Sequence, residues 1–277
     1  MAWGVFAATG CAALSFVSPA RADALSELSA NISSVSDLVF QDIQHITIGL
    51  GPKFGPDYKG SDDYKVKPDL TFNLRFGNRF SASTEGVEFT LFGIRRVTFG
   101  PTVHISGRRG AHVNPDIEGL GRLRRSPELG VFAKALWPDQ LSLRLSVRQG
   151  IARGHEGTLV ELEGSAQVYR NASEDVTGYL GFSTTWTDSH YTQSFFGIDA
   201  GQAAASGLPE YHPGNSMRDA SVSATLRWVL SPHWALNSVA EYSRLIDDVA
   251  SSPMVEDVGS PNQFSIGVVM ARTFRLK

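Results

Sequence analysis

The sequence of 277 residues predicts an all-β protein, a single closed antiparallel transmembrane β-barrel of about 12 strands. The first observation is an alternation of apolar and polar residues, a period of two that strands produce and helices do not. The second is that the alternating segments have roughly 9–14 residues, enough to cross a bilayer at the tilt of a barrel strand. The third is that long connections occur alongside tight turns.

A soluble β-sandwich is the alternative fold. Its strands are usually shorter, about 5–6 residues, and it has to hide two apolar sheet faces against each other. In this chain the polar positions of the strands are rich in Arg, Glu, Ser, Thr and Gln, and several strands end in Trp or Tyr. A barrel with a polar interior and an apolar outer band explains both features.

The clearest strand is 140–153, where leucines alternate with arginines and serines. We expect Leu143 and Leu145 to face lipid and Arg144 to face the lumen. Glu161 and Glu163 share a lumen-facing parity, which predicts ion pairs filling a narrow interior; a pore is the alternative. The other predicted strands begin at Ile46 and continue at 64–76, 79–92, 95–107, 127–136, 158–170, 175–187, 190–198, 219–230, 233–245 and 262–275.

The connections predict the orientation of the barrel. If both termini are periplasmic, the long connections 55–63, 199–218 and 246–261 are extracellular, and the tight turns at 77–78, 187–189 and 231–233 are periplasmic. Long loops outside and short turns inside are typical of outer-membrane barrels.

The segment 107–126 is the exception, because this count makes it both long and periplasmic. It contains five arginines, of which Arg122, Arg124 and Arg125 are the candidate partner-binding residues. A guanidinium can pair bidentately with carboxylates of a partner protein or of peptidoglycan stem peptides. The alternative is that the arginines lie near anionic lipid head groups or are solvated.

The N-terminus predicts export. Residues 1–22 resemble a signal peptide, with an apolar run at 5–17 and small residues at Ala20 and Ala22. Residues 23–45 form a polar periplasmic lead-in, and residues 46–277 form the barrel. The single cysteine, Cys11, falls in the signal segment, so the mature chain can form no disulfide. The net charge of −3 does not indicate a nucleic-acid partner.

Motifs for chemistry are weak. Asp188, Ser189 and His190 have the residue types of a hydrolase triad, but neighbours on a strand point to opposite faces and cannot converge. The acids Asp62 and Asp63 are too few for a calcium ion, which needs six or more oxygen ligands. The seven histidines lack metal-ligand spacing. We therefore predict no catalytic residues, no cofactor and no metal.

Four blocks of sequence resemble the MipA/OmpV family, the family of the MltA-interacting protein. The likeness extends from about Ile46 to the C-terminus, with the blocks in the family's order. One departure is that Phe274 is followed by Arg275-Leu276-Lys277, whereas such barrels usually end on an aromatic residue. The blocks are Gly55-Pro-Asp-Tyr-Lys-Gly-Ser-Asp-Asp-Tyr64, Trp186-Thr-Asp-Ser-His-Tyr-Thr-Gln-Ser-Phe-Phe-Gly197, Gln202-Ala-Ala-Ala-Ser-Gly-Leu208 and the residues Asp247, Ser251–Glu256 and Gly259–Phe264.

The resemblance implies a location in the outer membrane and a non-catalytic role. The named member is a scaffold that joins a murein-degrading lytic transglycosylase to a murein synthase. The implied partners are therefore outer-membrane lipid and these two enzymes, with the oligomeric state left open. A small-solute channel or an adhesin is the alternative function, and a membrane-embedded hydrolase is a third. No catalytic residues are carried over from the family.

Overall fold

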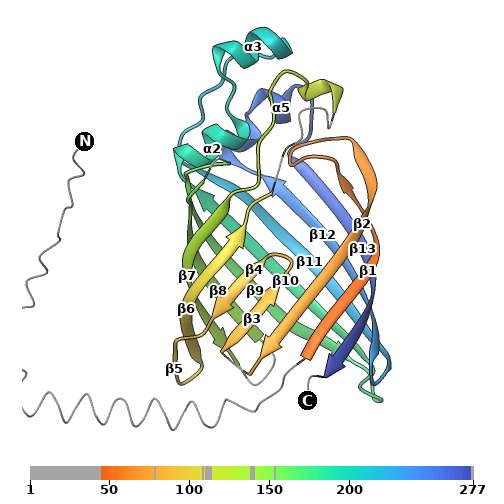
Figure 1. Cartoon of the computed structure of the whole chain (residues 1–277). Helices are drawn as coiled ribbons and strands as arrows, with labels where there is room; N and C mark the ends of the chain where they lie inside the picture. The colour runs from red at the N-terminus through yellow and green to blue at the C-terminus, as the bar shows by residue number, and fades with distance from the viewer. Residues whose placement is uncertain are drawn as a thin grey trace, which may run out of the picture.

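The computed structural model describes residues 45–77, 79–107, 109, 114–137, 141–152 and 154–275. They form a closed antiparallel barrel with long connections and short helices at one end and both described termini at the other (Figure 1). The predicted signal peptide 1–22 and nearly all of the lead-in 23–45 lie outside the described residues, as do Leu276 and Lys277. No described helix is long and apolar enough to cross a membrane.

The sheet has 13 strands, and all of them except β5 (Phe92–Ile94) form the barrel ring. Every described pairing is antiparallel, and the ring closes where β4 pairs with β6. This confirms the predicted 12-stranded barrel. The ring strands are β1 (His45–Pro56), β2 (Tyr64–Phe76), β3 (Phe80–Ser83), β4 (Gly86–Phe89), β6 (Val97–Ile105), β7 (Pro127–Leu136), β8 (Leu141–Gly150), β9 (Thr158–Arg170), β10 (Val176–Thr187), β11 (Ser216–Ser231), β12 (Trp234–Leu245) and β13 (Asn262–Arg275).

The predicted strand 79–92 is wrong, because this segment folds back on itself. It forms the short hairpin of β3 and β4, followed by β5. The hairpin turns at Thr84 and Glu85, where the Glu85 amide donates to the Ser83 hydroxyl at 3.2 Å. A serine or threonine that bonds the backbone two residues on favours a turn over a continued strand.

The predicted strand 190–198 is also wrong, because it is the helix α2 (Ser189–Phe196). Asp188 caps this helix: its carboxylate accepts from the Tyr191 amide at 3.0 Å and from the Thr158 amide at 2.9 Å. Tyr191 and Phe195, one helical turn apart, stack with their ring centroids 4.4 Å apart. An Asp cap followed by apolar residues spaced by four is a helix signal.

The β3–β4 hairpin puts two strands where the sequence predicts one, and α2 replaces one predicted strand, so the number of strands in the ring is unchanged. Every connection that lies between the hairpin and α2 in the sequence, however, is at the opposite end of the barrel from the predicted one. The described residues of the segment 107–126 lie at the end that carries the helices and the connections after β1 and β12, opposite the described termini (Figure 1). Its predicted periplasmic location, beside the short turns, is therefore wrong. The tight turn predicted at 187–189 also lies at the helix end, as the start of the connection between β10 and β11.

The strand alternation separates the two faces of the wall as predicted. Leu145 pairs with Leu162 across the sheet, faces outward and is 45% exposed. Arg144 pairs with Glu163 and faces the lumen. Outward positions along the other strands carry large apolar side chains that are exposed in the isolated chain, including Leu70, Leu180, Val222 and Met270. An apolar outer surface over a polar interior is what a bilayer requires of a barrel.

Helices cluster in the loops at one end. The connection between β10 and β11 carries α2 and α3 (Ala200–Ser206), and the connection between β12 and β13 carries α4 (Asp247–Ala250) and α5 (Pro253–Glu256). A 3-10 turn, η1 (Pro115–Ile117), lies between β6 and β7. Together with 57–63 these connections form one packed layer, called here the cap, over the mouth of the barrel (Figure 1).

We expect Leu145→Arg to lower the free energy of unfolding by about 2–4 kcal/mol, because position 145 lies near the middle of β8 and faces lipid. Ser142→Arg places the same charge on the lumen side of the same strand and should cost far less. Urea unfolding in lipid vesicles, followed by the heat-modifiable gel mobility of barrels, measures both. Equal losses for the two variants would contradict this assignment of faces.

Candidate functional site

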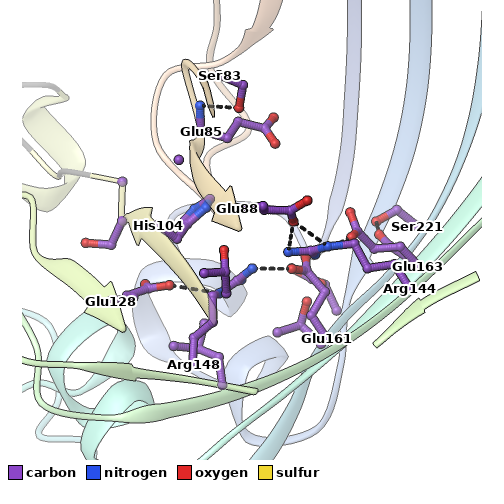
Figure 2. Close-up of a pocket in the computed structure, with 18 of the residues that line it drawn as sticks. Ser83, Glu85, Glu88, His104, Glu128, Arg144, Arg148, Glu161, Glu163 and Ser221 are labelled. Carbon is purple, nitrogen blue, oxygen red and sulfur yellow. Dashed lines mark hydrogen bonds and ion pairs between the residues drawn. The ribbon is translucent and has the colours of Figure 1, made fainter. Parts of the chain in front are cut away.

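The lumen contains a ladder of ion pairs, and the upper rung is centred on Arg148 of β8. Arg148 Nε lies 3.0 Å from Glu128 Oε2 on β7, and Arg148 Nη1 lies 2.8 Å from Glu161 Oε2 on β9. His155 Nε2 lies 3.0 Å from the other oxygen of Glu128. Glu128 is 1% exposed and Arg148 is buried, so this rung is a desolvated network that fixes three neighbouring strands (Figure 2).

The lower rung is centred on Arg144. Its Nη1 lies 2.6 Å from Glu163 Oε2 on β9, and its Nη2 lies 2.8 Å from Glu88 Oε1. Glu88 belongs to β4, on the hairpin that completes the ring, so this pair joins the hairpin to β8 past the intervening strands (Figure 2). Together the rungs confirm the prediction of lumen ion pairs, because each arginine forms ion pairs with two carboxylates.

A third charged cluster joins the cap to the wall. Asp219 accepts from Lys59 Nζ at 2.6 Å and from Arg218 Nε at 2.8 Å. Arg218 also donates to the Tyr191 hydroxyl of α2 at 2.9 Å. The register between β10 and β11 shifts here, so that Arg218 has no partner residue in the ladder. This β-bulge explains how two adjacent residues both face the lumen, which regular alternation does not allow.

The charged side chains surround a lumen cavity of about 530 Å³. A second space of about 350 Å³ shares Lys134, Arg144 and Glu163 with it and is otherwise lined mainly by Ser, Thr and Gly. The two spaces form one polar interior that begins under the cap. The charged residues that line the larger cavity are Lys59, Arg75, Lys134, Arg144, Arg148 and Arg218, with Glu85, Glu88, Glu128, Glu161, Glu163, Asp219 and Glu241.

The cap has a hydrophobic core of its own. Phe196, Ile198, Val249 and Val255 are almost completely buried, and they come from two different long connections. The other two connections of the cap also contribute to this core, through Tyr58 in 57–63 and through Ile117 and Leu120 between β6 and β7. Two strand residues, Leu159 of β9 and Leu245 of β12, complete it. The mouth of the barrel is therefore occupied by tightly packed side chains.

Hydrogen bonds connect the separate segments of the cap. The Tyr58 hydroxyl donates to the Met254 carbonyl at 3.2 Å, and the Ser252 hydroxyl donates to the Phe196 carbonyl at 2.7 Å. Arg109 donates to the carbonyls of Phe195 at 2.7 Å and Leu120 at 3.2 Å. The four sequence blocks that carry the family resemblance all contribute residues to this one structure.

Burial sets the ionisation of the cap. It raises the pKa of the Tyr58 and Tyr191 hydroxyls above the usual tyrosine value, so both remain protonated. It lowers the pKa of Arg109, whose ordinary value is so high that the guanidinium remains charged. Burial opposes ionisation of Asp57, but hydrogen bonding and the charge of Lys65, with Nζ 2.8 Å from Asp57 Oδ2, lower the pKa of that carboxyl.

The candidate arginines are not brought to the lumen. Arg122, Arg124 and Arg125 are exposed on the cap, between η1 and β7. That these arginines bind a partner stays a prediction, but they lie at the cap end of the barrel and not at the end with the short turns. The Asp188, Ser189 and His190 group does not converge either: Asp188 is engaged with backbone amides, and His190 is 78% exposed with Nδ1 4.0 Å from Asp188. No group of metal-ligating residues occurs among the described residues.

Several site residues were missed by sequence reasoning. His155 and Glu128 form a buried pair, yet His155 lies in a connection and Glu128 is next to a strand start. The sequence pattern places Lys59 only in the long connection 55–63. A signal was available for Glu128, because its parity within 127–136 matches the lumen side of a strand. None was available for Lys59, whose partner Asp219 is far away in the sequence.

The family model described as "MltA-interacting protein MipA" matches residues 48–274. The chain belongs to the MipA family. As a barrel of this family it is an outer-membrane protein, and its Vibrio relatives are named as outer membrane proteins. The match covers the cap and all of the ring except the first residues of β1 and the last residue of β13, so the lumen ladder and the cap core lie within the matched region.

Two relatives differ in how much of the chain they match. The MltA-interacting protein of Escherichia coli (strain K12) is 29% identical over 33% of this chain, and the match spans only 36% of that protein's length. The outer membrane protein Omp26La of Vibrio anguillarum is 29% identical over 78% of this chain and 83% of its own. An outer membrane channel from Pseudomonas putida F1 has a TM-score of 0.43 and 11% identity, covering 84% of this chain and 96% of its own. That structural likeness is too weak to indicate a shared function.

Removing the centre of the upper rung should destabilise this MipA-family barrel. Arg148→Met leaves Glu161 unpaired and Glu128 with His155 alone, and breaking a buried ion pair in this way costs about 3–5 kcal/mol. Arg170→Met is the control, because its pair with Glu174, at 3.4 Å, is on the surface and is worth less than about 1 kcal/mol. Urea unfolding in vesicles measures both, and a loss for Arg148→Met no larger than the control would contradict a structural role for the rung.

The cap should unfold separately when its core is damaged. Phe196→Ala removes a fully buried ring and should cost the cap about 3–5 kcal/mol. Limited proteolysis should then cut 188–215, while the heat-modifiable mobility of the barrel is kept. His190→Ala, an exposed residue of the same helix, is the control. Equal protection of the two variants would show that the cap does not depend on this core.

Proposed function

We propose that this protein is a non-catalytic scaffold that links the outer membrane to a murein-degrading lytic transglycosylase and a murein synthase. The observation that carries the proposal is the cap, whose buried core fills the mouth of the barrel. A barrel whose mouth is closed by packed side chains, and whose lumen is crossed by ion pairs, suits an anchor better than an open diffusion pore. The family description and the name of the E. coli relative support the same role.

The docking surface belongs at the end of the barrel opposite the cap. Short turns face the periplasm in outer-membrane barrels, and the murein enzymes act there. The turn between β5 and β6 presents Arg95 and Arg96, both exposed. Its geometry is defined, because Arg95 adopts φ 54° and the Leu136 amide donates to the Arg96 carbonyl at 3.0 Å. Two guanidinium groups on a rigid turn suit carboxylates of a partner protein.

For Arg122, Arg124 and Arg125 the proposal keeps a partner-binding role but moves it to the other side. They lie at the cap end, and so they would meet carboxylates or phosphates at the outer surface of the membrane. In the scaffold proposal these three arginines are therefore the matched control for the periplasmic pair. The periplasmic pair and the three cap arginines are all exposed cationic side chains in connections. A general effect of losing positive charge would therefore appear in both sets of variants, whereas loss of a specific docking surface would appear in only one.

We expect Arg95→Asn combined with Arg96→Ser to reduce co-purification of the lytic transglycosylase several-fold from detergent-solubilised envelopes. Asparagine is chosen because it tolerates positive φ at position 95. The triple variant Arg122→Ser, Arg124→Ser and Arg125→Ser should leave co-purification unchanged, and both variants should retain heat-modifiable mobility. A wild-type barrel that captures neither murein enzyme would overturn the scaffold proposal, and loss of capture in the triple variant alone would overturn the proposed docking face.

A small-solute channel is the second candidate function. The observation that favours it is the polar interior, in which two adjacent spaces of about 530 and 350 Å³ share lining residues. Passage would require the cap to move, so Phe196→Ala should raise conductance in planar bilayers if the cap is the barrier. A wild-type barrel that conducts as well as this variant would favour the channel over the scaffold.

A further inference from the structure

An arginine lies on the outer face of the barrel near the cap. Arg244 is the next-to-last residue of β12, and its side chain is exposed. On the same strand, Glu241 and Ser243 line the lumen cavity. Because successive residues of a strand point to opposite faces, Tyr242 and Arg244 face outward. The Arg244 guanidinium is therefore presented to the membrane and not to the lumen.

Aromatic residues on neighbouring strands show the depth of this arginine in the membrane. Tyr242 is directly opposite Phe264 of β13, whose amide donates to the Tyr64 hydroxyl of β2 at 3.1 Å. The Tyr64 ring stacks on Phe54 of β1, with the ring centroids 5.2 Å apart. The four strands are adjacent in the wall (Figure 1). Aromatic belts lie at the level of the lipid head groups. Arg244 is roughly 7 Å further along the strand toward the cap, which places it at the level of the lipid phosphates.

Asn262 of β13 is directly opposite Arg244 and holds its guanidinium. Arg244 Nη1 and the Tyr242 hydroxyl both donate to Asn262 Oδ1, each at 2.8 Å. Since a guanidinium can only donate, this contact identifies the oxygen of the Asn262 amide. The amide nitrogen, on the other side of the group, forms no hydrogen bond with a described residue. Arg244 and Asn262 thus present N–H donors together at one exposed place.

The acids nearest to Arg244 in the chain are engaged elsewhere. Asp247 Oδ2 accepts from the Met217 amide at 3.3 Å, and Asp248 Oδ2 accepts from the Gly214 amide at 2.7 Å. All residues of β11, β12 and β13, and of the connections next to them at the cap end, are described, and none of their carboxylates forms an ion pair with Arg244. Nε and Nη2 of the guanidinium therefore remain for an acceptor from outside this part of the protein.

The wall below Arg244 has room for an acyl chain. Further into the membrane on the same outward face, Ala240 of β12 is directly opposite Ala224 of β11. The residues beside this pair are longer, because Leu180 of β10 is opposite Ala224 and Ile266 of β13 is opposite Ala240. An acyl chain that lies over the two alanines gains apolar contact with the side chains on both sides.

The orientation of the barrel decides which lipid meets these groups. The short turns of outer-membrane barrels face the periplasm, so the cap end and Arg244 belong to the outer leaflet. This leaflet is built from lipopolysaccharide, whose lipid A is a phosphorylated disaccharide with several acyl chains. A guanidinium pairs bidentately with a phosphate, and an amide N–H can donate to a phosphate or sugar oxygen.

We propose that Arg244 and Asn262 form a binding site for a phosphate group of lipid A on the outer face of β12 and β13. The guanidinium donates to the phosphate through Nε and Nη2, while Nη1 stays on Asn262. One acyl chain of the lipid runs over Ala224 and Ala240 toward the middle of the membrane. The site does not rest on the scaffold proposal, because it uses neither the periplasmic turns nor the three cap arginines.

The site is tested by native mass spectrometry of the detergent-solubilised protein, titrated with lipid A that carries both phosphates. Arg244→Gln should weaken binding at least fivefold, because glutamine keeps a donor for Asn262 but has no charge for a phosphate. Arg272→Gln is the matched control and should bind as the wild type does. Arg272 is an outward cation beside aromatic rings too, with Cζ 5.4 Å from the Trp234 centroid and 4.8 Å from that of Phe274, but it lies at the other end of the barrel. Unchanged binding by Arg244→Gln, or an equal loss in Arg272→Gln, would overturn the proposal.

Asn262→Asp distinguishes a lipid site from a structural contact. The new carboxylate keeps and strengthens the bond to Arg244, but it neutralises the guanidinium and removes the amide donor. Lipid A binding should therefore fall at least fivefold, while heat-modifiable mobility is kept. Full lipid A binding by this variant would contradict the site.

The choice of lipid is tested with two further probes on the wild-type protein. Lipid A without phosphates should bind as weakly as intact lipid A binds to Arg244→Gln. Phosphatidylglycerol, which has a phosphate but no disaccharide, should bind at least fivefold more weakly than lipid A. If phosphatidylglycerol bound as tightly as lipid A, with the same dependence on Arg244, the assignment to lipid A would be wrong.

Discussion

Closure of the ring is the constraint on which the whole structure depends. Hydrocarbon offers no partners to backbone N–H and C=O groups, so the strands have to satisfy one another all the way round. Nine neighbouring strand pairs do this over eight or more residue pairs, but the β2–β3, β3–β4 and β4–β6 pairs have only four, three and three. The ring is thus completed by a short hairpin rather than by a full-length strand.

The lumen charges compensate for this weak closure. Arg144 on β8 pairs with Glu88 of the hairpin, so a partly buried ion pair supports the place where backbone pairing is shortest. The upper rung fixes β7, β8 and β9 in the same way, through Glu128, Arg148 and Glu161. Burying such charges costs solvation free energy, which full pairing and additional hydrogen bonds offset. The ladder therefore fixes the register of β7, β8 and β9 and holds the hairpin in the ring, in addition to any net stability that it adds.

The sequence predicted the class of fold, the strand number and the lumen ladder, because all three follow from a period of two. It failed at two places where local hydrogen bonding overrides that period. Ser83 turns the chain at Glu85, and Asp188 begins a helix where the alternation predicts the strand 190–198. The errors cancelled in the strand count but reversed the side of 107–126. The Arg218 bulge and the Lys59–Asp219 pair depend on tertiary contacts, which alternation along one strand does not encode.

The cap follows from the same closure. A ring of alternating strands brings every second connection to one end, so Tyr58, Ile117, Phe196 and Val255 meet although they are far apart in the sequence. Their burial then fixes the connections after β1 and β6, and the bond between Asn114 and Asp63 joins those two connections. The cap thus connects β2 and β6 at the outer end of the barrel, and the β3–β4 hairpin joins the same two strands nearer the other end.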